Sequence, residues 1–167
     1  MGHEWTTVSG GPFSVLNFTG SAVRYVNDEG TGQAEVYIEP LFGAWYGWDM
    51  SDKQSSTTST SWQNKASYTT PSTVPAGWYR IGYSFEWRRN STGSDFKARL
   101  QISNSSTVME LSEESQDSNS WHSAGGFYIV QLSEGNHTID LDYCGESPKY
   151  SSYIRRARLE FWMINDV

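Results

Sequence analysis

Apolar and polar side chains alternate along several segments in the second half of the chain. Between residues 79 and 87 every odd position is apolar, and charged, polar or small residues lie between them. The same period of two continues over residues 96–102 and 136–143, and again over 153–164. Because successive side chains of a strand point to opposite faces, each segment predicts a half-buried β-strand.

Polar turns lie between these predicted strands. Residues 90–95 and 133–135 have the Asn, Ser, Gly and Asp content of hairpin loops. We therefore expect strand 96–102 to pair antiparallel with strand 79–87, and strands 126–132 and 136–143 to form a second hairpin. In the last strand, alternation puts Tyr153 on the same face as Ala157, Leu159, Phe161 and Met163.

The first half of the chain has shorter strand candidates, at residues 13–18, 22–26, 35–38 and 41–48. Residues 51–75 are rich in Ser and Thr, contain two prolines and predict a long loop. No segment has helical periodicity. Many short strands separated by turns predict an all-β fold, an antiparallel jelly-roll-like β-sandwich forming a single domain. We divide it into N-terminal strands with an attachment segment (1–48), the loop (49–76) and the main strands (77–167).

The charge and cysteine content of the chain exclude several classes of function. The net charge of −7 argues against nucleic acid or a membrane as partner, since both attract clustered Lys and Arg. The single cysteine, Cys144, excludes an intramolecular disulfide and a Cys-based zinc site. Residues 1–7 lack the basic start and apolar middle of a signal peptide, so we expect synthesis in the host cytoplasm without one.

The sequence has none of the common catalytic or phosphate-binding motifs, and no His lies at metal-ligand spacing from another His or Cys. We expect no enzyme activity and no catalytic, cofactor-binding or metal-binding residue. His137 alternates with apolar residues and is interpreted as packed and hydrogen-bonded. Cys144 is interpreted as an unreactive thiol because no base lies beside it in the sequence.

Two acidic sites are candidates for catalysis or metal binding. Asp140 and Asp142 lie two residues apart on one strand face, roughly 7 Å between side chains. That spacing suits an inverting glycosidase or calcium, but solvated acids on an exposed strand face are the favoured interpretation. Glu113 and Glu114, within the acidic stretch 110–117, are interpreted as part of a solvated loop.

Two further groups are candidates for recognition. Trp45, Tyr46 and Trp48, with Trp62 beyond them, form either a platform for sugar rings or part of the core or a subunit interface. Arg155, Arg156 and Arg158 are either a solvated face or the source of interchain salt bridges, because Arg grips carboxylates with two bonds.

Three segments of the C-terminal half carry a family resemblance. Residues 75–88 place a strand after Pro-x-Gly-x-Tyr, residues 132–143 place one after Leu-x-x-Gly-x-His-Thr, and residues 154–162 run Ile-Arg-Arg-Ala-Arg-Leu-Glu-Phe-Trp. Together they resemble bacteriophage virion jelly-roll proteins of the capsid decoration, head fibre and tail accessory type. Those proteins are distantly similar to the trimeric tumour-necrosis-factor and C1q heads.

This resemblance implies a function and partners. It implies a non-enzymatic structural protein of a phage virion, a decoration or cement protein that stabilises the capsid shell. The implied partners are further copies of the chain, as a homotrimer, and the major capsid protein or a tail protein, bound through the N-terminal part. The alternative is a carbohydrate-binding or receptor-binding module of a tail or head fibre, with a glycan as partner.

Overall fold

The computed structural model describes the backbone of residues 23–28, 34–38, 46–103 and 106–166. The chain divides into two compact units, Met1–Glu39 and Pro40–Val167. In the first unit, β1 (Val23–Asp28) pairs antiparallel with β2 (Ala34–Ile38), as expected for the strands at 22–26 and 35–38. The strand expected at 13–18 lies outside the described residues. Our division of the chain at residues 48 and 76 and its assignment to one domain stay predictions.

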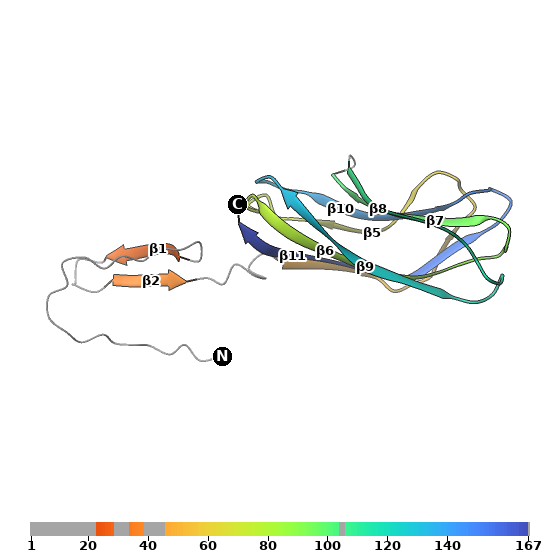
Figure 1. Cartoon of the computed structure of the whole chain (residues 1–167), viewed down its shortest axis with the longest axis horizontal. Coiled ribbons are helices and arrows are strands. Elements are labelled where there is room, and N and C mark those ends of the chain that lie inside the picture. Colours follow the sequence, from red (N-terminus) through yellow and green to blue (C-terminus); the bar gives the residue numbers. More distant parts are fainter. Residues whose placement is uncertain (1–22, 29–33, 39–45, 104–105, 167) are drawn as a thin grey trace. The chain divides into compact units, whose positions relative to one another are not determined.

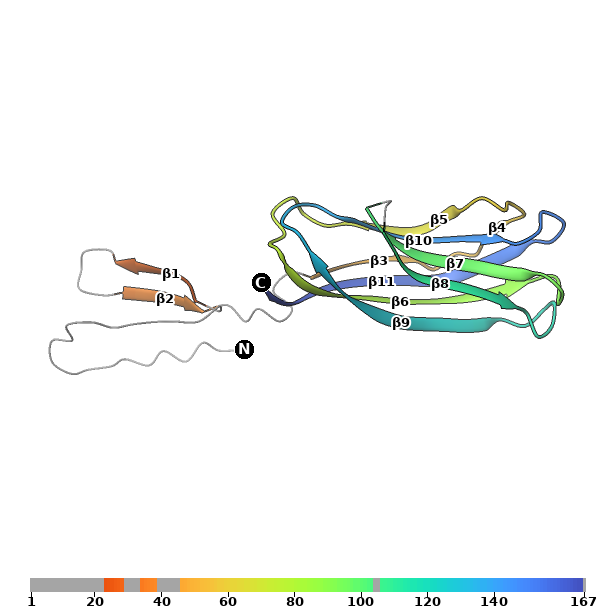
Figure 2. The same ribbon diagram turned by 45° about the horizontal axis from the view of Figure 1, so that its top comes forward.

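The second unit is a sandwich of two antiparallel sheets (Figures 1 and 2). Sheet I has the order β3-β11-β6-β9, from β3 (Tyr46–Ser51), β11 (Ser152–Asp166), β6 (Gly77–Arg89) and β9 (His122–Leu132). The short β4 (Ser55–Thr57) also pairs with β11. Sheet II has the order β5-β10-β7-β8, from β5 (Gln63–Thr69), β10 (Thr138–Gly145), β7 (Asp95–Ile102) and β8 (Ser106–Glu114).

The order of the strands is that of a jelly roll. Each sheet interleaves strands from the beginning and the end of the unit, so that β11 lies between β3 and β6, and β10 lies between β5 and β7. Nine strands and no helix make up residues 46–103 and 106–166. The all-β, antiparallel jelly-roll prediction is confirmed. Within the described residues, the structure also has no helix of the length and apolarity needed to cross a membrane.

The expected strand pairings are wrong. Strand β7 does not pair with β6, because β6 lies in sheet I between β11 and β9, while β7 lies in sheet II between β10 and β8. The expected hairpin of β9 and β10 is likewise split between the two sheets. Alternation shows that a strand is half-buried, but both arrangements bury the same faces, so the pattern does not select the partner.

The long loop expected at residues 51–75 is also wrong, since it contains β4 and β5. Strand β5 pairs with β10, and its only buried residues are Lys65 and Ala66. Because these two are adjacent and neither is a large apolar residue, the sequence of β5 has no strong apolar alternation. Strand β8 occupies part of the acidic stretch interpreted as a loop. It is one of the two edge strands of sheet II, where exposed charges are normal.

The core lies between the inner faces of the two sheets. The odd positions of β6 from Tyr79 to Trp87, except the half-buried Tyr83, are almost fully buried, as alternation predicts. Trp87 stacks on Phe96 at a ring distance of 4.8 Å, and Tyr79 stacks on Phe161 at 4.6 Å. These aromatic pairs join neighbouring inner positions of the sandwich, and burial of each side chain contributes about 2–3 kcal/mol.

A β-bulge interrupts β11. Arg155 pairs with Glu86 and Arg158 pairs with Ser84, so two residues, Arg156 and Ala157, stand opposite one. Arg156 has a φ of 50°, in the left-handed region that non-glycine residues rarely adopt.

The bulge changes which positions face the core. Before it Ser152 and Ile154 are buried, and after it the buried positions are Ala157, Leu159, Phe161 and Met163. Tyr153 was expected on the inner face with Ala157, and this is wrong. It is half-buried on the outer face, because alternation restarts in the opposite phase after a bulge.

Candidate functional site

The outer face of sheet I exposes large aromatic side chains. On β3, Tyr46 and Trp48 are 70% and 58% exposed and point to the same side, since they are two residues apart on a strand. The register places Trp162 of β11 beside Tyr46, and Glu160 beside Trp48. One end of the sheet therefore has a continuous aromatic surface.

The aromatic surface continues across β6 to β9. Phe127 and Ile129 of β9 are 56% and 49% exposed, and their partners on β6 are Gly82 and Arg80. The Arg80 guanidinium lies 4.6 Å from the Phe127 ring and 5.9 Å from that of Trp162. We call Tyr46, Trp48, Trp162, Phe127 and Ile129, arranged around Arg80, the aromatic face.

Few polar contacts interrupt the aromatic face. Arg80 Nη1 lies 3.6 Å from Glu160 Oε2, an ion pair that is largely open to solvent. A Cβ at Gly82 would lie 3.2 Å from that carboxylate oxygen and 3.3 Å from Arg80 Nη1, so the absence of a side chain gives the pair its room. Contiguous exposed aromatics of this kind typically mark a surface that binds another molecule.

The structure brings together two of the four aromatics singled out in the sequence. Tyr46 and Trp48 lie side by side on the aromatic face, whereas Trp62 lies on the outer side of sheet II, with its ring 4.6 Å from the Arg99 guanidinium. Trp45 lies outside the described residues. Sequence reasoning missed Phe127 and Ile129, although their odd positions in a run of apolar residues pointed to a strand with both sides apolar.

Further along the outer face of sheet I, the three candidate arginines are bound within the chain. Arg155 Nε lies 2.6 Å from Glu86 Oε2, Arg156 Nη1 lies 2.7 Å from Glu86 Oε1, and Arg158 pairs with Asp52. Hydrogen bonds from Arg155 and Arg156 lower the pKa of the Glu86 carboxyl below its usual value. One carboxylate thus serves two guanidinium groups.

A fourth arginine, Arg88, belongs to the same surface and was not singled out in the sequence. Its guanidinium lies 4.3 Å from the Tyr153 ring and 5.2 Å from the Trp121 ring, and Arg155 lies 3.9 Å from Trp121. We call Arg88, Arg155, Arg156 and Arg158 the basic cluster. Only the bulge and the rings of Tyr153 and Trp121 bring these arginines together, and neither has a sequence signature.

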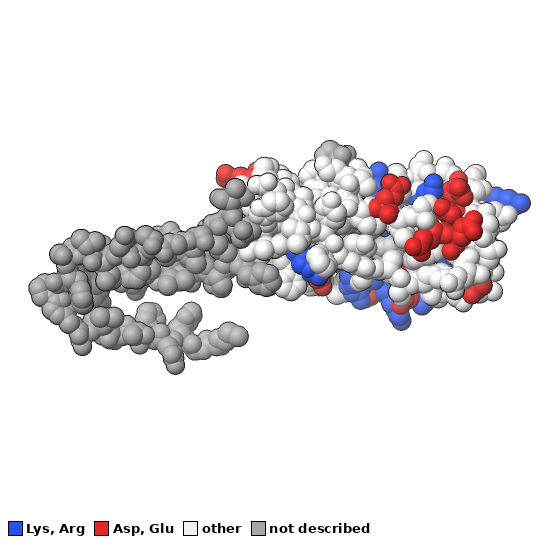
Figure 3. Space-filling model, in the orientation of Figure 1, with Lys and Arg blue, Asp and Glu red and all other residues white. Residues whose placement is uncertain are grey.

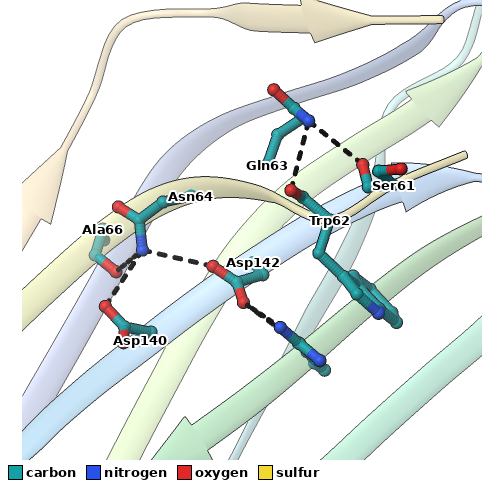
Figure 4. A network of polar contacts seen from close by, with 8 residues as sticks. Ser61, Trp62, Gln63, Asn64, Ala66, Asp140 and Asp142 are labelled. Atoms are coloured by element: carbon teal, nitrogen blue, oxygen red, sulfur yellow. Dashed lines mark hydrogen bonds and ion pairs between the residues drawn. The ribbon is translucent and has the colours of Figure 1, made fainter. Parts of the chain in front are cut away.

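A polar network lies on the outer face of sheet II (Figure 4). The Asn64 amide donates to Asp140 Oδ1 at 3.1 Å and to Asp142 Oδ1 at 3.2 Å. Arg99 donates from Nε and Nη2 to Asp142 Oδ2, at 3.0 and 2.9 Å. Figure 4 shows the Asn64 amide directed at both carboxylates, and the Trp62 ring near the Arg99 end of the network.

This network changes the interpretation of the two acids. Asp140 and Asp142 are only 8% and 7% exposed, so the expectation of solvated carboxylates is wrong. They are buried because Asn64 and Arg99 reach over them from the neighbouring strands β5 and β7. Among the residues with described side chains, no three His, Cys, Asp or Glu are grouped to hold a metal ion.

The two remaining candidates are His137, which is half-buried just before β10, and the buried Cys144. His137 has Nε2 2.9 Å from the Ser133 carbonyl, and its backbone N–H donates to Thr70 Oγ1 at 2.8 Å, as expected for a packed, hydrogen-bonded histidine. Cys144 is buried, and burial raises the pKa of its thiol. A protonated, enclosed thiol is a poor nucleophile, which agrees with its interpretation as unreactive.

Comparisons with known proteins show similarity of fold alone. No family model and no curated protein matches the sequence. Eiger TNF from S. frugiperda superposes with a TM-score of 0.55 at 9% identity, covering 77% of this chain and 96% of that one. A chain in the structure of infectious bursal disease virus Gt strain has a TM-score of 0.54 at 9% identity, covering 86% of this chain and 38% of that one.

Both similar structures have jelly-roll folds, which agrees with the strand order found here. At sequence identities this low, the activities, ligands and partners of the similar proteins cannot be assigned to this chain. No comparison identifies a phage protein.

Proposed function

We propose that this chain is a non-enzymatic structural protein of a phage virion, a capsid decoration protein that stabilises the shell as a homotrimer. The observation that carries the proposal is the aromatic face, an exposed apolar surface on an otherwise well-packed sandwich. The fold it shares with a viral chain and with a TNF, and the sequence resemblance to virion jelly rolls, support it. The partners are further copies of the chain and the major capsid protein or a tail protein.

Burial of the aromatic face drives the association. Trp, Tyr, Phe and Arg are enriched where proteins associate, and the aromatic face combines all four around Arg80. Covering apolar surface contributes about 25 cal/mol for each Å² removed from water. A protein that binds the assembled shell in preference to its separate subunits stabilises that shell by mass action.

The experiment has two stages and uses the whole chain. Light scattering gives the mass in solution, for which we expect a trimer, and co-sedimentation with phage shells stripped of decoration protein is expected to pellet the chain. The double variant Trp48→Ser, Phe127→Ser should be monomeric and remain in the supernatant. Trp62→Ser, which removes an aromatic from sheet II, is the matched control and should behave as wild type. A wild-type monomer that ignores shells contradicts the proposal.

One observation favours a second candidate, a carbohydrate-binding or receptor-binding module of a tail or head fibre. Tyr46 and Trp48 lie adjacent on one side of the edge strand β3, where flat aromatic rings can stack on sugar rings. In that case Tyr46→Ala and Trp48→Ala should abolish binding on a glycan array without lowering the melting temperature. An array without any signal for the wild-type chain eliminates this candidate.

We assign no catalytic role to Asp140 and Asp142, because Asn64 and Arg99 already bind Asp140 Oδ1 and both oxygens of Asp142. A glycan hydrolase activity of the wild type that disappears in the Asp140→Asn, Asp142→Asn double variant would contradict this.

A further inference from the structure

The basic cluster carries more charge than its own chain neutralises. Arg155 and Arg156 share Glu86, and Arg158 pairs with Asp52. Four guanidinium groups thus face two carboxylates, which leaves two positive charges in a chain whose net charge is −7. A concentrated positive surface on an otherwise acidic protein specifically attracts a negatively charged surface.

Arg88 is the member without a counter-ion. Its side chain makes no hydrogen bond or ion pair within the part of the chain that the structure describes, and its Nε is buried without a partner. The rings of Tyr153 and Trp121 hold the guanidinium by cation–π contacts and restrict its motion. A half-buried cation that is fixed and unpaired is prepared to receive a carboxylate from outside.

Strand β8 carries the complementary charge. Its side chains Glu110, Glu113 and Glu114 are exposed, and none has an ion pair among the described residues. The strand is an outer edge of sheet II, so it is open to a partner along its length. Figure 3 shows acidic side chains gathered over β7 and β8, and basic side chains at the lower margin of the same view.

The two charged surfaces lie on different sheets of one sandwich, the basic cluster on sheet I and the acidic strand on sheet II. One copy can therefore present its basic cluster to the acidic strand of the next copy. Two basic clusters, or two acidic strands, do not pair with each other because their charges are alike. Contacts between unlike patches repeat head to tail and close into a ring when the rotation allows. A trimer is such a ring.

We propose that the basic cluster binds strand β8 of a second copy of this chain, with Arg88 donating to the carboxylate of Glu114, which shares the outer face of sheet II with Glu110. The inference rests on the proposed function in one respect, namely that the chain self-associates. It adds the surface and the partner strand, and it moves the expected interchain salt bridge from the internally paired arginines to Arg88.

The test is a charge swap, with mass measured by light scattering over a concentration series. The basic-side variant Arg88→Glu and the acidic-side variant Glu114→Lys should each raise the dissociation constant about tenfold or more, because like charges then meet. Both changes in one chain restore opposite charges at every contact and should return the mass to that of wild type. Lys149→Glu and Glu134→Lys are matched controls on other exposed positions and should leave it unchanged.

A second basic-side variant protects the test against misfolding. Arg156→Glu changes a side chain that is 61% exposed, so it should fold even if Arg88→Glu does not, and it should act in the same direction. Assembly of wild type should also weaken as salt is raised from 50 to about 500 mM, since screening shortens the range of these charges.

Each outcome decides the inference. Loss of assembly in both half-swapped chains with recovery in the full swap supports it. Wild-type assembly in either half-swapped chain, or no recovery in the full swap, overturns it and leaves the proposed self-association standing. A wild-type chain that is monomeric at every concentration overturns both.

Discussion

The outer faces of the two sheets differ in which side chains are paired and which are exposed. On strands β5, β7 and β10 of sheet II, Asp140 and Asp142 are bound by Asn64 and Arg99 and are nearly buried under them. On sheet I the aromatic side chains stay exposed, and Arg88 has aromatic rings beside it but no carboxylate. The comparison teaches that the polar network of β5, β7 and β10 serves the fold, whereas the aromatic face is the surface that we propose contacts a second molecule. Substitutions on the two faces should therefore separate stability from association.

The largest effect on stability is expected from sheet II. Asp142→Ala leaves Arg99 without its carboxylate in a largely buried site, which should lower the free energy of unfolding by about 3 kcal/mol. Urea denaturation followed by Trp fluorescence measures it. Glu160→Ala on sheet I removes a solvent-open ion pair and is the control, with an expected loss below about 0.5 kcal/mol. Equal losses in the two variants would remove the distinction between the faces.

A smaller effect is expected from the amide that joins the two acids. Asn64→Ala removes hydrogen bonds to Asp140 and Asp142, and should cost about 1.5 kcal/mol because both acceptors are charged and buried. Amide hydrogen exchange should show faster opening of β5 and β10 with little change in sheet I. Uniform acceleration across both sheets would contradict a local role.

On the aromatic face the expected effect on stability is near zero. Trp48→Ser removes an exposed side chain and should change the free energy of unfolding of the monomer by less than about 0.5 kcal/mol. Thermal unfolding at low protein concentration, where assemblies dissociate, makes this measurement. A clear loss of monomer stability would show that Trp48 belongs to the fold and not to a contact surface.

The smallest expected effect is that of pH on the stability contributed by the pairing of Glu86 in the basic cluster. Arg155 and Arg156 lower the pKa of Glu86 from its ordinary 4.5, so their pairing stabilises the fold above pH 4.5 and is lost as the pH falls through the lowered value. An NMR titration of the Glu86 carboxyl should have its midpoint below 4.5, and Arg156→Gln should move that midpoint upward. Unchanged midpoints in the variant would mean that Arg156 does not hold the carboxylate.

The sequence predicted the strands better than their partners. The apolar positions of the alternating pattern in β6, β7 and β10 are buried as expected, apart from the half-buried Tyr83, because which face of a strand is apolar is a local property of the sequence. The split of β6 and β7 between sheets was not predictable, since it depends on contacts far apart along the chain. Strand β5 was missed because Ser, Thr and Ala at its positions resemble a loop in composition.

The candidate surfaces were predicted in part for the same reason. Tyr46 and Trp48 were singled out from their clustering in sequence, but Phe127 joins them only through pairing of β9 with β6. Asp140 and Asp142 were placed correctly on one strand face, yet their burial comes from Asn64, which is 76 positions from Asp140. Arg88 gave no signal, because its lack of a counter-ion is visible only in three dimensions.

The bulge in β11 has a consequence for the length of that strand. Arg156 and Ala157 share one partner position, so at this point the strand holds one residue more than its neighbour β6 requires. If Arg156 is deleted, Ile154 and Ala157 become alternate residues and both still point inward, as do Leu159 and Phe161 after them. A deletion within a central strand ordinarily turns every later side chain to the wrong face. Here it leaves the core intact, removes the left-handed residue and takes away one guanidinium, so this strand can lose a residue and still fold.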